Sequence, residues 1–244
     1  VTNIDIAIPP PPGQPQAAAE PPPTSNPEGK ALAAKVVQAM GGLARLQAVK
    51  ALRAEFNEQE PEGGGTNVEV TIQFPDQMHV GIATPQGPMT IVVTPTAGFM
   101  VPPGGGVQNL PDSAKAESLQ QIHRDLVYVG QHLDDPSFIF SSGGTEKVGG
   151  LDAQVLDVSG SGSQIRWLID PATGRIVREK YQANGPSGPF EGETDLEDWK
   201  DTNGITLPAL HKNRQNGKLA STVETTKLEF NPTVDPKLFE RPAN

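Results

Sequence analysis

The 244-residue chain contains no cysteine, and this absence removes several chemistries at once. It excludes disulfide bonds, zinc sites built from cysteine thiolates, and a cysteine nucleophile. Positive charge is also scarce, because 19 lysine and arginine residues stand against 29 acidic residues and leave a formal net charge of −10. Binding to a phosphate backbone or to anionic lipid needs clustered cations. The sequence therefore predicts no nucleic-acid partner and no electrostatic docking on a membrane.

Long apolar runs are missing as well. No segment approaches the roughly 18 consecutive apolar residues of a membrane-spanning helix, so we predict no transmembrane segment. The first residues, VTNIDIAIPPPP, have neither the basic region nor the apolar core of a signal peptide, and no initiator methionine precedes them. We therefore expect a processed chain or a piece of a longer one.

The sequence offers no recognisable catalytic or metal-binding motif. None of the four histidines belongs to the paired His-x-x-Glu-His type of motif that zinc peptidases use; they are His79, His123, His132 and His211. His123 and His132 lie on opposite sides of a continuous helix and would converge only if that helix broke near Asp125. We interpret both as surface or capping residues. Gly160-Ser161-Gly162-Ser163 looks like a nucleophile elbow but lies between two strand-like runs, so we predict a hairpin turn there. The predictions are no catalytic residue, no metal and no cofactor.

Composition divides the chain into three parts. Residues 1–8 alternate polar and apolar side chains, which is enough for one short strand, and we interpret them as the last strand of a preceding domain. Residues 9–27 are almost purely Pro, Ala, Gln, Glu and Ser, a composition typical of an extended interdomain linker, with a disordered tail as the alternative. Residues 28–242 carry the periodic apolar pattern of one folded domain.

Two long segments of this domain have helical periodicity. Asn26–Met40 starts with a capping asparagine and a proline and ends at a glycine pair. Asp112–Val129 spaces its apolar residues by three or four positions, and it can break near Asp125. Residues 43–49 suggest a further short helix.

Most of the remaining chain alternates with period two, in short runs separated by turn residues, which is typical of an antiparallel meander. Ile165–Tyr181 is one such hairpin, with its turn at Asp170–Gly174. We predict that Trp167 in its first strand faces the helices, while Arg166 and the turn face water. The Asn-Gly pairs at 203–204 and 216–217 predict two further hairpins with turns of the primed type.

Six segments agree in order and spacing with a known pattern: Met40–Leu43, Leu46–Val49, Val148–Leu156, Trp167–Gly174, Asp201–Pro208 and Asn231–Phe239. Together they resemble the outer-membrane lipoprotein-sorting fold, the LolA/LolB-type carrier superfamily. More closely, they are similar to domains of this kind at the C-terminus of bacterial pitrilysin/insulinase-type zinc peptidases. The resemblance implies a mainly β (α+β) fold. Its wide antiparallel sheet would form an unclosed half-barrel of about 11 strands, with the concave face covered by about three helices.

The resemblance also implies a non-catalytic, periplasmic or cell-envelope domain that binds a lipid, a lipidated peptide or another apolar ligand between the sheet and the helices. The alternative hypothesis is an interaction or scaffold module that forms the C-terminal part of a pitrilysin-type zinc peptidase and lacks the zinc motif itself. A peptidase domain upstream of the chain would support this alternative.

Flexible methionines, which suit irregular acyl ligands, gather on the early strands and suggest where such a cavity lies. The predicted cavity residues are Phe74, Met78, Val80, Met89, Ile91, Phe99, Met100, Leu119, Ile122, Leu126 and Trp167. The alternative is that these residues form an ordinary packed core.

An acidic stretch at Glu191–Asp198 has two interpretations. Alternation places Glu193, Asp195 and Glu197 on one face of a strand. Their oxygens could bind a hard cation such as calcium. The other interpretation is a solvated acidic strand face that discourages edge pairing.

Overall fold

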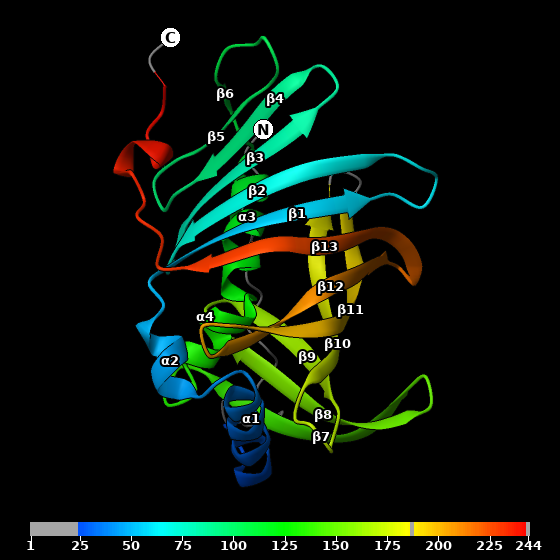
Figure 1. Cartoon of the computed structure of the whole chain (residues 1–244). Helices are drawn as coiled ribbons and strands as arrows, with labels where there is room; N and C mark the ends of the chain where they lie inside the picture. Colours follow the sequence, from blue (N-terminus) through cyan, green and yellow to red (C-terminus); the bar gives the residue numbers. More distant parts are fainter. Residues whose placement is uncertain (1–23, 186–187, 243–244) are drawn as a thin grey trace, which may run out of the picture.

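The computed structural model describes residues 24–185 and 188–242. The strand predicted at residues 1–8 and most of the linker predicted at 9–27 lie outside the described residues. The described part of the chain forms one antiparallel sheet of 13 strands with helices against one face (Figure 1). This arrangement confirms the predicted mainly β fold with an unclosed sheet.

The sheet consists of two meanders joined side by side. Its strand order is β6-β5-β4-β3-β2-β1-β13-β12-β11-β10-β9-β8-β7, and every neighbouring pair is antiparallel. The first meander comprises β1 (Ala51–Gln59), β2 (Gly65–Gln73), β3 (Gln77–Thr84), β4 (Gly87–Val93), β5 (Gly98–Val101) and β6 (Gln108–Asn109). The second comprises β7 (Ile139–Val148), β8 (Leu151–Gly160), β9 (Ser163–Ile169), β10 (Ile176–Gly185), β11 (Gly188–Thr202), β12 (Ile205–Gln215) and β13 (Lys218–Phe230). β6 and β7 form the two edges, so the sheet remains open.

The predicted number of strands was slightly low. β6 has two residues, too few to show an alternation in the sequence. The number of helices was also low, because the long segment after β6 is two helices. These are α3 (Asp112–His123) and α4 (Leu126–Gln131), separated at Asp125 as expected. The Asp125 carboxylate caps α4, accepting hydrogen bonds from the Val127 and Tyr128 amides at 2.8 and 3.3 Å.

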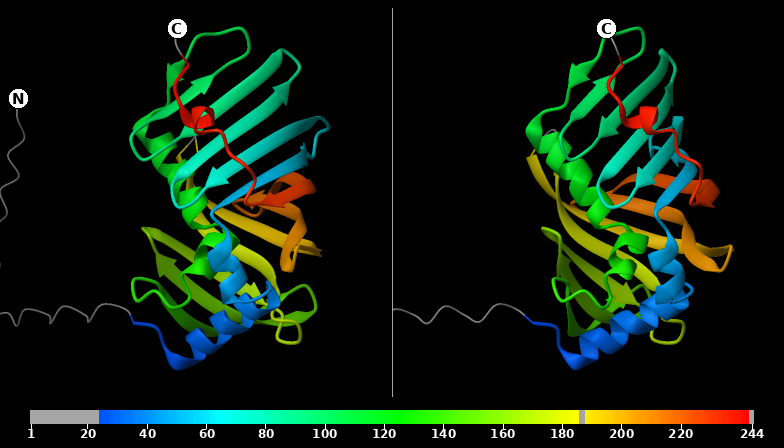
Figure 2. Two further views of the ribbon diagram at one scale, coloured as in Figure 1. Left: turned by 60° about the vertical axis from the view of Figure 1, so that its left-hand side comes forward. Right: turned by 90° about the vertical axis from the view of Figure 1, so that its left-hand side faces the viewer.

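The helices divide the concave face between them (Figure 2). α1 (Pro27–Ala39), α2 (Leu43–Ala48) and α4 lie over the β7–β9 end, whereas α3 runs across the sheet toward β3 and β4. The C-terminal segment, with the short 3₁₀ helix η1 (Pro236–Phe239), lies on the other side of the first meander. Within the described residues, α3 is the helix that runs over the concave face of the first meander.

The Ile165–Tyr181 hairpin has the orientation that its sequence predicted. Trp167 is 1% exposed and packs in the main core with α1 residues such as Val36. Arg166 keeps 47% of its side chain exposed and pairs with Asp157 across the strands. Asp170 accepts a 2.8 Å hydrogen bond from the Ala172 amide in the turn. The register predicted around Trp167 is confirmed. The turn faces water at residues 171–173, which are exposed, but Gly174 is buried against Lys35 of α1.

Three other turns also follow their predictions. Asn203 and Asn216 have φ values of 55° and 49°, and each is followed by a glycine with positive φ, as type I′ turns require. Gly160–Ser163 forms the turn between β8 and β9 and precedes no helix, so it is a hairpin and not a nucleophile elbow.

Candidate ligand-binding cavity

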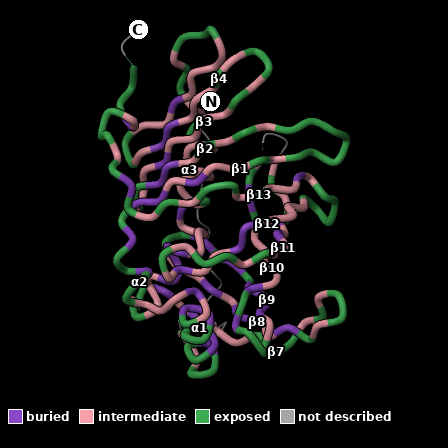
Figure 3. Tube along the Cα trace, viewed as in Figure 1, coloured by how far each residue is buried: buried purple, intermediate pink, exposed green. Residues whose placement is uncertain are grey.

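A cavity of about 550 Å³ lies between the concave face of the sheet and helices α3 and α4. Its volume falls within the range of about 300–1,000 Å³ that is usual for small-molecule sites. It exists because the two ends of the sheet are covered unequally. Figure 3 shows buried residues concentrated near the helices at the β7–β9 end, while β2 and β3 carry mostly intermediate and exposed residues.

One half of the cavity wall is apolar and comes from β1–β4. Cross-strand pairing places Phe56, Val68 and Ile82 in one row, and Val70, Val80 and Ile91 in the next. Leu52, Ile72 and Met78 complete this wall. Period-two alternation accounts for the pattern, since every second residue of these strands points to the concave face.

The other half of the wall is polar and comes from β10–β13 and the C-terminal part of α3. The polar residues lining it are Ser118, Gln121, Arg124, Asp125, Glu179, Tyr181, Thr194, His211 and Asn213. Leu196 and Val223 are its apolar members, and Glu58 adds a carboxyl group from the end of β1. Thr194 and Asn213 bond each other across the strands, and Asn213 also bonds Ser221 on β13. Thr194 Oγ1 donates to Asn213 Oδ1 at 3.1 Å, and Asn213 Nδ2 donates to Ser221 Oγ at 3.1 Å. The cavity is therefore amphipathic, because one half of its wall is apolar and the other half is mostly polar.

Arg124 is the one cation among the residues that line the cavity, and it already has partners. Its Nη2 lies 2.6 Å from Oε1 of Glu117, and its guanidinium carbon lies 4.6 Å from the centre of the Tyr181 ring. Glu117 in turn accepts a 2.8 Å hydrogen bond from the Asn184 amide. This network holds α3 against β10. Within it the positive charge of Arg124 is paired with the negative charge of Glu117.

Glu179 is a strongly perturbed group of the cavity. Burial raises the pKa of its carboxyl to about 7, although the positive charge of Arg124 opposes the shift. Its cross-strand neighbour is Trp167. The indole of Trp167 also opposes the pKa shift, but Nε1 of Trp167 and Oε2 of Glu179 do not reach full hydrogen-bond geometry, and neither atom has another partner among the described residues.

Two further groups have shifted pKa values for the same physical reason. Burial raises the pKa of Asp125 to about 6, although its two amide hydrogen bonds oppose the change. Burial lowers the pKa of His211 to about 4, so this imidazole is neutral at neutral pH. Burial thus shifts all three pKa values toward the uncharged form, although Asp125 remains mostly ionised at neutral pH.

Four of the predicted cavity residues line this cavity: Met78, Val80, Ile91 and Leu126. Two more, Met89 and Met100, are cross-strand neighbours of lining residues. Leu119 and Ile122 of α3 pack against the apolar half of the wall, and Phe74 packs against Tyr128. Trp167 lies in the main core. Phe99 lies on the opposite face, where it packs with Val92 and Phe239. A ligand-binding role for these residues stays a prediction.

Sequence reasoning did not identify the polar wall. Alternation did predict which residues of β11 share a face. If Glu193, Asp195 and Glu197 lie on one face, Thr194 and Leu196 lie on the other. The sequence had no signal for which of these faces is concave. That depends on the direction in which the sheet curves and on the helices that pack against it.

His123 and His132 do converge, because the helix breaks at Asp125. Their rings lie on Tyr128, with ring centres 5.0 and 4.4 Å from that of the tyrosine. Nδ1 of each histidine lies within hydrogen-bond distance of a backbone carbonyl, and His132 is the C-cap residue of α4. Their geometry is that of packing and capping residues.

The acidic stretch lies on β11, and the edge-pairing interpretation was wrong because β11 is an interior strand between β10 and β12. Its carboxylates pair with cations of those neighbours. Asp195 contacts both Arg178 and Arg214, and Glu197 lies 2.7 Å from Lys212. Burial alone would raise the pKa of Asp195, but the arginine hydrogen bonds outweigh it and hold the pKa below its usual range.

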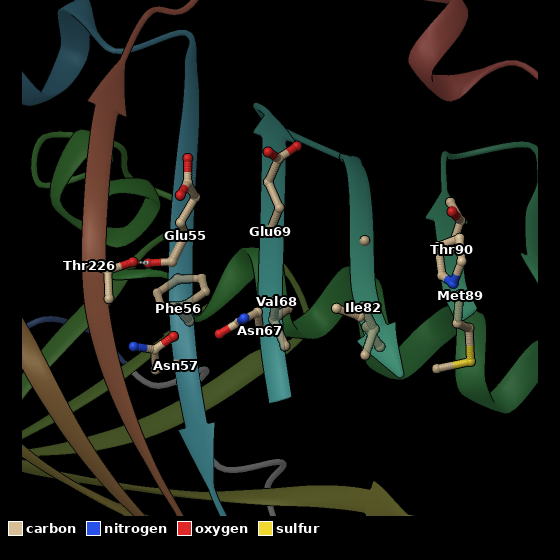
Figure 4. Close-up of a pocket in the computed structure, with 13 residues that line it drawn as sticks. Glu55, Phe56, Asn57, Asn67, Val68, Glu69, Ile82, Met89, Thr90 and Thr226 are labelled. Carbon is tan, nitrogen blue, oxygen red and sulfur yellow. Dashed lines mark hydrogen bonds between the residues drawn. The ribbon is translucent and has the colours of Figure 1, made fainter. Parts of the chain in front are cut away.

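A second hollow, of about 480 Å³, crosses β1–β4 on the convex face (Figure 4). It lies between one row that contains Glu55, Glu69 and Gly81 and another that contains Asn57 and Asn67. Its space arises partly because Gly81 has no side chain. No helix lines this hollow, so the cavity under α3 is the better enclosed of the two.

No protein-family model and no curated protein matches the chain. Solved structures do match it. A DUF1329 family protein from Desulfovibrio piger superposes with a TM-score of 0.57 at 11% identity, covering 87% of this chain and 97% of the other. The LolA superfamily protein NE2245 from Nitrosomonas europaea gives 0.55 at 11% identity, with the same coverage. An outer-membrane lipoprotein-sorting protein domain from Vibrio parahaemolyticus gives 0.52 at 12% identity, covering 87% and 96%.

These similarities show that the chain has a LolA-like fold. At such low identity they establish the fold alone, so the function has to be argued from the cavity. In the part of the chain that the structure describes, no helix has the length and apolar character needed to cross a membrane.

Proposed function

We propose that the protein is a non-catalytic binder of a lipid, an acyl chain or another apolar ligand, and that the ligand occupies the cavity beneath α3. The observation that carries the proposal is the incompletely covered apolar wall. Val68, Val70, Val80 and Ile82 are only half-buried, although they lie on the concave face. A ligand that covered them would remove apolar surface from water, which is the main favourable term in such binding.

The magnitude is sufficient for a chain-like ligand. Each methylene group moved from water into the cavity contributes about 0.8 kcal/mol, which tightens binding about fourfold. A ligand of fixed head group should therefore bind more tightly with each added methylene until the apolar wall is covered. The fold supports the same class of ligand, because solved structures similar to this one include a LolA superfamily protein and a lipoprotein-sorting domain. A periplasmic or cell-envelope location and a lipidated peptide as ligand belong to the same proposal.

The test has two steps. Native mass spectrometry of the purified protein looks for co-purifying lipid, and displacement of a fluorescent fatty-acid analogue then measures affinities for a series of chain lengths. Val70→Trp fills the apolar half of the cavity and should abolish binding. Asn67→Trp is the matched control, because Asn67 is exposed on the opposite face of the same strand. Binding that is absent in the wild type, or unchanged by Val70→Trp in a folded protein, contradicts the proposal.

A second proposal, a scaffold module of a zinc peptidase, is favoured by a different observation. β7 is an edge strand of 10 residues, and among residues 24–185 and 188–242 only its beginning is covered, by Ser25 and Asn26. The Phe140 amide donates to Ser25 Oγ at 3.0 Å, and the Ser142 amide donates to Asn26 Oδ1 at 3.1 Å. The remaining edge suits strand addition by a partner. The coding sequence upstream of residue 1 tests this proposal: a peptidase domain supports it, whereas a signal peptide favours a free binding protein.

A further inference from the structure

The cavity has two chemically different halves, and this division bears on the head group of its ligand. The apolar half comes from β1–β4 and the polar half from β10–β13 with α3. A purely apolar ligand would cover the first half, but it would displace water from polar groups of the second half without giving them partners, which is costly. The ligand that fits both halves is an amphiphile.

The charges of the polar half restrict the head group further. Three carboxyl groups line the cavity, those of Glu58, Asp125 and Glu179. The one cation among the lining residues, Arg124, is already paired with Glu117 at 2.6 Å. An anionic head group would enter a site with excess acidic groups and no free positive partner, so the electrostatics oppose it.

One acceptor of this wall lacks a well-formed hydrogen bond. Oε2 of Glu179 is shielded from solvent, and the donor beside it, the indole of Trp167, does not reach full hydrogen-bond geometry, whereas the Asp125 carboxylate is satisfied by the amides of α4. A buried polar atom without a partner is costly, and a ligand that supplies a donor removes that cost. His211 and Tyr181 lie on the same wall and bring no positive charge at neutral pH, because burial lowers the pKa of His211 to about 4.

We propose that the cavity selects amphiphiles whose head group is not anionic and donates hydrogen bonds, and that Glu179 accepts one of these bonds. The proposal rests on the proposed apolar-ligand function and names the chemical class of the ligand's polar end. Ammonium, amide and hydroxyl head groups satisfy it, whereas a free carboxylate does not.

The test compares ligands that share one alkyl chain: dodecylamine, dodecanamide and dodecanoate. Their affinities are measured by displacement of an uncharged fluorescent probe at about pH 8, where the Glu179 carboxyl is largely ionised. The amine and the amide should bind at least about tenfold more tightly than dodecanoate, since a hydrogen bond to a charged group is worth that factor or more. In Glu179→Gln the preference for the amine over dodecanoate should fall at least about tenfold.

Glu55→Gln is the control, because it removes the same charge from the convex face of β1. It should change the ratio of the affinities for dodecylamine and dodecanoate by less than about twofold, which is the effect expected of a distant surface charge. Equal binding of the three ligands by the wild type overturns the head-group proposal but leaves the apolar-ligand function intact. A preference that persists in Glu179→Gln overturns the role of Glu179. Absence of binding by all three ligands overturns both proposals.

If Glu179→Gln fails to fold, the wild type alone still provides a test. The affinity for dodecylamine should weaken between about pH 8 and pH 5.5, because the Glu179 carboxyl gains a proton over this range while the amine remains charged. Asp125 gains a proton in the same range and acts in the same direction. An affinity that stays constant or rises on acidification contradicts the proposal.

Discussion

Glu179 should make the folded protein less stable as the pH rises toward neutrality. Burial raises the pKa of its carboxyl from 4.5 to about 7 in the folded state. Between these two values the folded protein retains a proton that the unfolded chain has released. The contribution of Glu179 to stability is therefore greatest below about pH 4.5 and is lost as the pH rises through 7. Glu179→Gln removes the ionisation while it keeps the size and shape of the side chain.

The size of the effect follows from the pKa difference. Each pH unit over which the two states differ by one proton changes the free energy of unfolding by about 1.4 kcal/mol, so the full range corresponds to about 3 kcal/mol. Asp125 acts in the same direction, because its pKa is also raised by burial. His211 acts in the opposite direction, since its pKa is lowered to about 4. The His211 contribution is the same in the wild type and in the variant and cancels in the difference. The charge of Asp125 is one cause of the Glu179 shift, so the difference includes the interaction between these two carboxyl groups.

The assay is urea unfolding of both proteins at a series of pH values from about 4 to 8, followed by circular dichroism and tryptophan fluorescence. The free energy of unfolding of Glu179→Gln minus that of the wild type should rise by about 3 kcal/mol across this range and level off above about pH 7.5. A difference that stays constant within about 0.5 kcal/mol would falsify the reasoning, because Glu179 would then titrate normally in the folded state. Addition of a donor ligand such as dodecanamide should reduce the difference at pH 8, because the ligand satisfies the ionised carboxylate.

Two further predictions concern stability alone. Asp195→Ala leaves two arginines of the neighbouring strands without their shared partner and should lower the free energy of unfolding by about 1–3 kcal/mol. The control is Asp152→Ala, which breaks a mostly exposed ion pair and should lower it by less than about 0.5 kcal/mol. Equal urea midpoints for the two variants would contradict this prediction. Gly41→Ala should be more destabilising than Gly63→Ala. Both glycines have positive φ, so the backbone strain of the two substitutions is similar. A Cβ at Gly41 would lie 2.1 Å from the Gly204 carbonyl oxygen, whereas a Cβ at Gly63 would meet no atom within 4 Å. Thermal unfolding measures this difference, and equal losses would show that the contact at Gly41 relaxes without cost.

Glu179 also shows how the proposed site conflicts with stability. A buried carboxyl that weakens the fold at neutral pH is unfavourable in a domain that only needs to fold, since an apolar or amide side chain of similar size would avoid the penalty. Sites that bind ligands commonly contain such unfavourable groups, because the binding partner is what satisfies them. Oε2 of Glu179, which lacks a well-formed hydrogen bond, is consistent with this pattern.

Much of the fold was predictable from local sequence patterns. The turns at Asp170–Gly174, at the two Asn-Gly pairs and at Gly160–Ser163 follow from the backbone conformations that these residues favour. The break in the helix at Asp125 follows from the capping preference of aspartate. The inward orientation of Trp167 follows from period-two alternation. Each of these signals is short-range, and each was confirmed.

The candidate site was predictable only in its apolar half. Alternation in β3 and β4 indicated Met78, Val80 and Ile91, and helical spacing indicated Leu126, all of which line the cavity. Phe99 obeys the same alternation but lies on the opposite face, since the odd and even residues of β5 are both apolar and the pattern cannot distinguish them. The residues of β11 taken alone predict an acidic edge strand. In the structure β11 is an interior strand, and its carboxylates pair with cations of the two neighbouring strands.

The sequence by itself determined the class of structure: short alternating strands, their turns, the positions of the helices and the absence of a catalytic motif. Only the tertiary structure decided which face of the sheet is concave and where the helices leave that face uncovered. It also decided that residues from β1, β10 and α3, far apart in the chain, line one amphipathic cavity. The reason is physical. Turns and caps depend on a few adjacent residues, whereas a cavity depends on how the sheet curves and on the long-range packing of all its covering elements.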